Sequence, residues 1–244
     1  MEKIVLRMDD VGASTKHFEV YSKKIFGNFL FLKYLPYFRA WPKYNELSVF
    51  EWSSIIELLI NSNAKLTLGV TACWVHKDSS LISFPEKFPE QAEILKQAQK
   101  DGIIEIANHG LTHCVIGEHL PKFFTSNRKY HREFWNWIPR QTHFEHIERS
   151  QKIFREWLGL FPQSFIPPGN VYSEDTLEAA HKNSILLFNS SVPPKDIECP
   201  LKYVNEASVD AFHDKELSLV GISWLQKKIQ EHNNKEFKLL SEIC

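Results

Sequence analysis

The chain carries the sequence IIEIANHGLTH at residues 103–113, where a short apolar run is followed by two histidines four residues apart. Residues 103–107 have the length and apolar character of a buried strand. His109 and His113 follow at its exit, where Gly110 permits a tight turn. If the chain turns helical there, both rings lie on one side and can share a metal ion. A lone pair with this spacing is more often structural, so its interpretation depends on the rest of the chain.

An acidic pair ends the first apolar run of the chain, KIVLRM at residues 3–8. Asp9 and Asp10 alone would be typical of a surface turn or a helix cap. A turn at Val11-Gly12 would instead let both side chains face the same opening. One aspartate could then join the two histidines on a metal, and the other could accept a proton from water. The residues therefore predict a hydrolytic site, provided that the two strand exits meet.

Strand and helix patterns alternate along the chain. Strands are predicted at residues 4–8, 66–71, 103–107, 164–166, 185–188 and 209–212, and helices at 50–62, 89–100, 144–158, 173–181 and 217–232. This alternation implies a mostly parallel sheet, either a barrel or a doubly wound sheet. In both architectures function concentrates where strands end. The candidate polar residues all fall at such exits: Asp9, Asp10, His109, residues 167–170 and His213.

His213 ends the last apolar run and is a candidate acid. It could protonate a leaving amine, with Asp214 or Asp210 tuning its charge. Taken alone, it is more typical of an ordinary surface histidine. His131, His143 and His146 are near enough in sequence to form a second cluster.

Two long segments, residues 18–44 and 123–143, fit neither pattern and are rich in aromatic residues. Loops of this length are usually functional covers or binding walls. The aromatic side chains could stack on sugar rings or form a satellite core beneath the loops. They are Phe29, Phe31, Tyr34, Tyr37, Phe38 and Trp41 in the first segment, and Phe124, Tyr130, Phe134, Trp135 and Trp137 in the second.

Composition restricts the class of protein. The chain has 244 residues, of which 43% are hydrophobic, and a net charge of −1. This length fits one domain over residues 1–244, and the charge gives no case for nucleic acid or an anionic membrane. The sequence begins without a signal-peptide pattern and has no bilayer-length apolar run. The four cysteines have no paired spacing, so we expect reduced thiols and a cytoplasmic location.

These motifs resemble, in order, those of the polysaccharide deacetylases with a NodB-homology domain, carbohydrate esterase family 4. Residues 8–12, MDDVG, look like the first motif of that family. Residues 105–113 are similar to the second, with Gly110 in the place of a serine or threonine. Residues 165–170, FIPPGN, keep the Pro-x-Gly turn of the third motif but lose its arginine. Residues 211–214, AFHD, resemble the last motif, although the family's Asp-Trp motif is absent, and residues 66–71 look like the family's second strand.

The resemblance implies a distorted (β/α)7 barrel that holds one divalent metal, most commonly zinc. It assigns Asp10, His109 and His113 as metal ligands, Asp9 as base and His213 as acid. The turn at Pro168, Gly169 and Asn170 would lie beside the substrate and its oxyanion. The arginine that normally steadies the base could be replaced by Arg7, Asn170, Arg128 or Arg140.

The expected function is removal of an N-acetyl group from an amino sugar, a precursor of a surface glycan that is free, nucleotide-linked or lipid-linked. A hydrolase of a non-sugar amide, such as a purine-derived ureide, is a second reading of the same fold. A third is a glycan-binding protein whose catalytic site has decayed. The lost arginine and Asp-Trp motif favour decay, whereas the retained aspartates and histidines argue against it.

Overall fold

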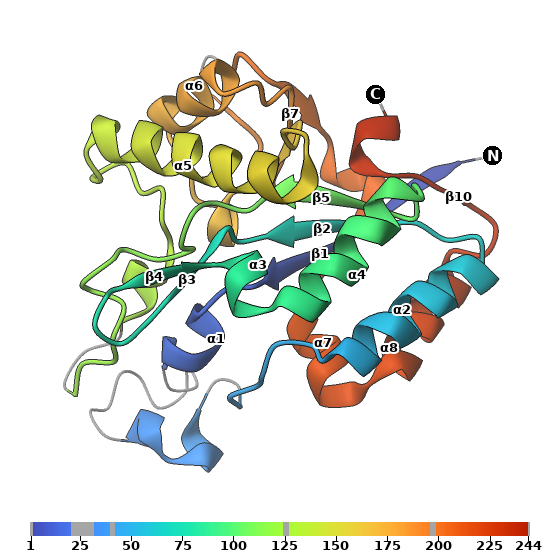
Figure 1. Ribbon diagram of the computed structural model, residues 1–244, viewed down its shortest axis with the longest axis horizontal. Helices are drawn as coiled ribbons and strands as arrows, with labels where there is room; N and C mark the ends of the chain where they lie inside the picture. Colours follow the sequence, from blue (N-terminus) through green and yellow to red (C-terminus); the bar gives the residue numbers. More distant parts are fainter. Residues whose placement is uncertain (1, 21–31, 40–41, 124–126, 196–198, 244) are drawn as a thin grey trace.

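A curled, parallel β-sheet lies at the centre of the computed structural model, which describes residues 2–20, 32–39, 42–123, 127–195 and 199–243 (Figure 1). Its strands are β1 (Lys3–Val11), β2 (Leu66–Val70), β5 (Ile104–Asn108), β6 (Ser164–Phe165), β7 (Leu187–Asn189), β8 (Lys202–Val204) and β9 (Val209–His213). They run in the order β9-β1-β2-β5-β6-β7-β8, and β10 (Glu236–Phe237) pairs with the start of β1. Every pairing in this sheet is parallel. The predicted distorted (β/α)7 barrel is therefore confirmed.

Helices pack on the outside of the curled sheet. They are α2 (Val49–Asn61), α4 (Pro89–Lys100), α5 (Arg140–Leu158), α6 (Glu174–Lys182), α7 (Asp214–Val220) and α8 (Ile222–Glu231). In Figure 1, α5 and α6 lie together on one side, and α2, α4 and α8 lie on the other. Helix α2 begins with a capping box between Ser48 and Glu51, and it buries Trp52, Ile55 and Leu59 on one face. This face joins the core formed with β1, β2 and β5.

Shorter elements lie between these units. They are α1 (Thr15–Phe18), α3 (Phe84–Lys87) and an antiparallel hairpin of β3 (Cys73–Val75) and β4 (Leu81–Ser83). Within the described ranges, no helix combines the length and the apolar character needed to cross a bilayer.

Some predicted boundaries were wrong for local reasons. The single helix expected at residues 217–232 is two helices, because Gly221 adopts a φ of 91° between α7 and α8. Helix α5 begins at Arg140, four residues before its first predicted residue. Strand β8 was not predicted, because its three residues, two of which carry polar groups, are too short to form an apolar run.

The two aromatic segments contact each other. Tyr34 stacks on Phe123, with ring centroids 6.2 Å apart. Phe134 is buried against Phe165, so at this position the satellite-core interpretation is correct. Tyr37 and Trp137 are 76% and 50% exposed, and sugar stacking there stays a prediction. Phe29, Phe31, Trp41 and Phe124 lie outside the described residues.

Candidate metal centre

Asp9 and Asp10 reach the same edge of the sheet because β1 contains a bulge. The pairing of β1 with β2 runs to Met8 opposite Leu68 and resumes with Val11 opposite Val70. Two aspartates therefore lie opposite one residue, Gly69, and Asp10 adopts a left-handed φ of 70°. The turn expected at Val11-Gly12 is also present, because Ala13 N donates to Asp10 O at 3.0 Å and Gly12 adopts a φ of 74°. Gly69 leaves the space for this arrangement, because a Cβ there would lie 3.1 Å from Asp9 Oδ1.

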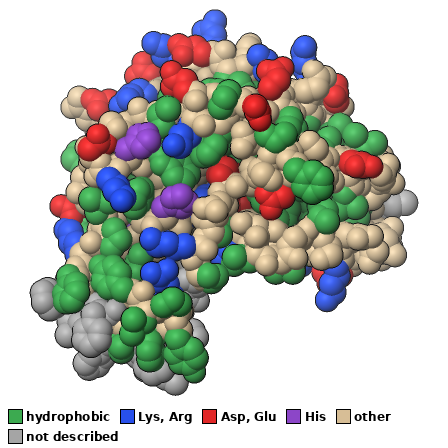
Figure 2. Space-filling view, turned by 60° about the horizontal axis from the view of Figure 1, so that its bottom comes forward, with side chains coloured by type: hydrophobic (Ala, Val, Ile, Leu, Met, Phe, Trp, Pro, Cys, Tyr) green, Lys and Arg blue, Asp and Glu red, His purple; other side chains and the backbone are tan. Residues whose placement is uncertain are grey.

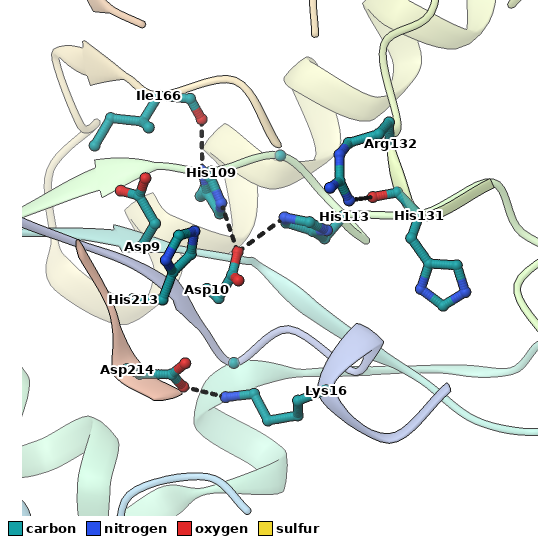
Figure 3. A network of polar contacts seen from close by, with 12 residues as sticks. Asp9, Asp10, Lys16, His109, His113, His131, Arg132, Ile166, His213 and Asp214 are labelled. Atoms are coloured by element: carbon teal, nitrogen blue, oxygen red, sulfur yellow. Dashed lines mark hydrogen bonds and ion pairs between the residues drawn. The ribbon is translucent and has the colours of Figure 1, made fainter. Parts of the chain in front are cut away.

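The structure brings Asp10, His109 and His113 together (Figure 3). Asp10 Oδ1 lies 3.3 Å from His109 Nε2 and 3.0 Å from His113 Nε2. One ligand atom from each of the three side chains falls within 4.8 Å of the others. A carboxylate oxygen and two imidazole nitrogens form a donor set that suits zinc or a similar divalent cation.

The two histidine rings are held in different ways. His109 Nδ1 donates to the carbonyl oxygen of Ile166 at 2.7 Å, which leaves its Nε2 lone pair directed at Asp10. Both ring nitrogens of His113 are buried, and neither makes a hydrogen bond of normal geometry with the described residues, although Nε2 lies 3.0 Å from Asp10 Oδ1. Leaving a buried polar atom without a partner costs about 1–3 kcal/mol, and a bound cation would supply that partner.

Charge in this group favours metal binding. Burial alone would raise the pKa of Asp10, but His113 and His109 beside it hold that pKa well below its usual range. Burial lowers the pKa of His113, so this ring is neutral near pH 7. Burial also disfavours the charged form of His109, but Asp10 and Asp9 outweigh this and raise its pKa. An ionised carboxylate beside a neutral imidazole is the state in which these side chains bind a divalent cation.

Arg7 holds the second aspartate. It lies two residues before Asp9 on β1, so both side chains point to the same face. Its Nε and Nη2 donate to Asp9 Oδ1 and Oδ2 at 3.1 Å and 2.9 Å. Its Nη1 donates to Glu206 Oε1 at 2.8 Å and also to Asn189. Arg7 is 2% exposed, whereas Arg140 pairs with Asp175 and Glu178 at the surface.

His213 lies beside the acidic pair, because the β1–β9 register places it opposite Asp9. Its side chain is 52% exposed, and its Nδ1 lies 3.9 Å from Glu216 Oε2. The expectation that Asp214 or Asp210 tunes its charge was wrong, because both carboxylates are engaged elsewhere. Asp214 accepts from the buried Lys16, and Asp210 pairs with Lys228 and His232.

The turn after β6 lines one side of the same pocket. Gly169 adopts a φ of 59°, and Arg132 packs so closely on it that a Cβ there would lie 1.8 Å from Arg132 Nε. Asn170 Oδ1 accepts hydrogen bonds from Ser191 N at 2.9 Å and from Ser190 Oγ at 3.1 Å, so this side chain is tied to the neighbouring loop. Gly169 and Asn170 line the pocket, whereas Pro168 is buried and does not line it.

The pocket has a volume of about 100 Å³ and contains residues that were not predicted. Asp9, Asp10, His109, His113 and His213 line it. The further lining residues are Thr15, Lys16, Glu19, Tyr44, Arg132 and Lys215. Thr15 and Lys16 lie on α1 and Lys215 lies on α7, whereas Glu19, Tyr44 and Arg132 come from irregular segments. No sequence period marks any of them as part of a site. Figure 2 shows lysine and arginine side chains gathered beside histidines on this face.

His131, His143 and His146 do not form a second cluster, because each has a different partner. His131 Nε2 donates to the carbonyl oxygen of His119 at 2.8 Å, and His143 Nδ1 lies 2.8 Å from Thr176 Oγ1. His146 Nδ1 lies 2.6 Å from a carboxylate oxygen of Glu133.

Solved structures share this fold at low sequence identity. A family 4 acetyl xylan esterase from Clostridium thermocellum, in complex with a cobalt ion, is 14% identical with a TM-score of 0.53, and the match covers 99% of this chain and 89% of that one. A peptidoglycan N-acetylglucosamine deacetylase is 15% identical with a TM-score of 0.52, covering 99% and 86%. A pseudoenzyme of the same family from Bacillus anthracis is 10% identical with a TM-score of 0.52, and the match covers 99% of this chain but only 64% of that longer protein. No curated protein matches the chain.

The fold is therefore that of the NodB-type carbohydrate esterases, family 4. The family model described as polysaccharide deacetylase matches residues 46–186, which is more than half of the chain. The protein belongs to the polysaccharide deacetylase family. The matched part contains His109, His113 and the turn at residues 167–170, while Asp9, Asp10 and His213 lie outside it.

Proposed function

We propose that this protein is a metal-dependent hydrolase that removes the N-acetyl group from an amino sugar. The observation that carries the proposal is the convergence of three metal-type ligands, a braced carboxylate and a histidine on one pocket. Asp10, His109 and His113 would hold the cation, for which zinc is our first candidate. When bound there, a divalent cation would polarise the acetamide carbonyl and make a nearby water more acidic.

Asp9 and His213 each carry out one of the two proton transfers. Asp9 accepts a proton from the attacking water, and the hydrogen bonds from Arg7 fix the orientation of its carboxylate. The water oxygen forms a bond to the acetyl carbon, and the C–N bond breaks as His213 gives a proton to the departing nitrogen. The products are acetate and the free amine. Asp9 subsequently releases its proton to solvent, and His213 takes one up.

The turn after β6 contributes to the same step. The N–H of Asn170 is already donated to the carbonyl oxygen of Pro167 at 2.9 Å. We therefore assign the backbone N–H of Gly169 as the donor that stabilises the oxyanion. Pro168 fixes the turn.

The substrate that we propose is a small N-acetylated amino sugar, free or linked to a nucleotide or lipid, in the cytoplasm. Acetylated sugars are the substrates named for two structural neighbours, the acetyl xylan esterase and the peptidoglycan deacetylase. One neighbour is a pseudoenzyme, so a decayed, glycan-binding protein is the competing proposal. The intact contact between Arg7 and Asp9 favours a working base, because a binding protein does not need a buried, oriented carboxylate at this position.

An acetate-release screen tests the proposal. The purified full chain, loaded with zinc or cobalt, would be incubated with free, nucleotide-linked and polymeric N-acetyl sugars, and separately with ureides. Acetate from a sugar is the expected product. Ammonia or urea from ureides alone would support the non-sugar amidase. Metal binding and sugar binding without any turnover would support the decayed protein.

A further inference from the structure

A buried carboxylate lies beneath the loop that carries both candidate histidine ligands. Glu133 is 2% exposed and comes from the irregular segment before α5. Its Oε1 accepts the backbone N–H of Leu111 at 3.1 Å. Its Oε2 accepts those of Thr112 at 3.2 Å and His113 at 2.9 Å. Three successive N–H groups of the loop thus converge on one side chain, which is the geometry of a backbone anion nest.

This contact stabilises an unusual backbone conformation at His113. The residue has a φ of 60°, in the left-handed region that residues other than glycine adopt only in a few per cent of cases. That conformation is unfavourable for a residue with a Cβ. The hydrogen bond from His113 N to Glu133 is formed in this conformation and offsets part of the cost. The direction in which the His113 ring leaves the backbone therefore depends on Glu133.

The Glu133 carboxylate lies so close to Gly110 that residue 110 has no room for a side chain. A Cβ on Gly110 would lie 2.2 Å from Glu133 Oε2, which is closer than atoms can approach. The position that carries serine or threonine in the related motif has no side chain here, and the Glu133 carboxylate fills the space. In this chain, a residue 23 positions further along the sequence therefore supports the loop.

The carboxylate is itself held from the opposite side. His146 of α5 places Nδ1 2.6 Å from Glu133 Oε1. Helix α5 packs on α6 and contributes Ile147 and Phe154 to the core, so this partner is anchored to the body of the fold. A continuous set of contacts therefore links α5, Glu133 and the backbone of His113.

We propose that Glu133 is a positioning residue for the metal centre, which sets the geometry of His113 and thereby the affinity of the site for a divalent cation. The inference rests on the metal-binding part of the proposed function and not on the identity of the substrate. Groups that orient metal ligands typically change metal affinity by 10- to 100-fold when they are removed.

The test compares two variants of Glu133 with a matched control in the full-length protein. Zinc dissociation constants would be measured by competition with a chromophoric chelator. Glu133→Ala is expected to weaken zinc binding by about 10- to 100-fold, and Glu133→Gln, which keeps one acceptor oxygen, by less. Glu105→Gln is the control, because Glu105 on β5 also accepts a backbone N–H, from Ser241 at 3.0 Å, but lies near the start of the strand. Its zinc affinity should stay at the wild-type value.

Hydrogen exchange of the metal-free protein supplies an independent readout. The amides of residues 111–113 should exchange much faster in Glu133→Ala than in the wild type, and at the wild-type rate in Glu105→Gln. Wild-type zinc affinity in Glu133→Ala, or unchanged exchange at these amides, would overturn the inference. If the wild type itself bound no zinc, the proposed function would fail, and the exchange experiment would still decide whether Glu133 positions His113.

Discussion

Arg7 and Asp9 form a bidentate ion pair on one face of strand β1, with Nε 3.1 Å from Oδ1 and Nη2 2.9 Å from Oδ2. This contact supports the proposal that Arg7 takes the place of the arginine that is missing from the turn at residues 165–170. Because residues i and i+2 of a strand share a face, this contact needs no loop to place it. Glu206 and Asn189 complete the surroundings of the guanidinium.

Removing this arginine should destabilise the fold. Arg7→Met leaves the Asp9 carboxylate and the partly buried Glu206 without their cation, and we expect a loss of about 3–5 kcal/mol in the free energy of unfolding. Arg140→Met is the control, because Arg140 also pairs with two carboxylates but is exposed. Urea unfolding should show little change for the control. An equal loss of unfolding free energy in both variants would contradict the prediction that the buried Arg7 pair contributes more to stability than the exposed Arg140 pairs.

Substitution by alanine should destabilise the protein more at Gly110 than at Gly117, which has a similar backbone conformation. Gly110 and Gly117 have φ values of 82° and 86°, but a Cβ meets Glu133 only at Gly110 and has no neighbour within 4 Å at Gly117. Gly117→Ala is expected to cost roughly 1–2 kcal/mol from backbone strain alone. Gly110→Ala should cost more and should also weaken zinc binding. Equal unfolding free energies for the two variants would argue against a tight Gly110–Glu133 contact.

His131 should make stability depend on pH. Burial lowers the pKa of His131 to about 3, against an ordinary value of 6.5. The unfolded chain therefore binds this proton below about pH 6.5 and the folded chain does not, so stability is lost as pH falls from 6.5 towards 3. The slope is at most about 1.4 kcal/mol per pH unit.

The measurement for His131 is a difference between two proteins. His131→Asn keeps an N–H donor without a titratable ring, so its unfolding free energy should fall less steeply in this range. Burial raises the pKa of Glu19 to about 7, which acts in the opposite sense between pH 4.5 and 7. Glu19 contributes equally to both proteins and cancels in the difference. Parallel pH profiles for wild type and variant would contradict the prediction.

The sequence predicts the sheet well because a strand buried on both faces has an almost continuous apolar run. β1, β2 and β5 have this character, and their exits carry the aspartates and histidines that meet in the pocket. The contact between Arg7 and Asp9 could also be predicted from the sequence, since their spacing places them on one face of a strand. The break at Gly221 had a local signal too, a glycine inside a helical pattern.

Other parts of the site have no local signal. Glu133 reaches the ligand loop across 20 residues of irregular chain, and no periodicity points to it. Arg132 and Glu19 line the pocket. Both belong to the long segments whose aromatic residues predicted a sugar-binding wall. Their positions depend on tertiary packing of loops, such as the hydrogen bonds of Asn127 to Phe18 and His119, which a pattern along the chain does not encode.

Metal content and acetate release, measured together on the wild type and on Asp9→Asn, test the assignment of one metal group and one separate base. Asp9 lies outside the Asp10–His109–His113 group, so the variant should bind one equivalent of zinc as the wild type does. Its rate of acetate release from the best N-acetyl sugar should fall by about 10²- to 10⁴-fold, the usual contribution of a general base. A variant that keeps its zinc and releases acetate at the wild-type rate would contradict the assignment of Asp9 as the base.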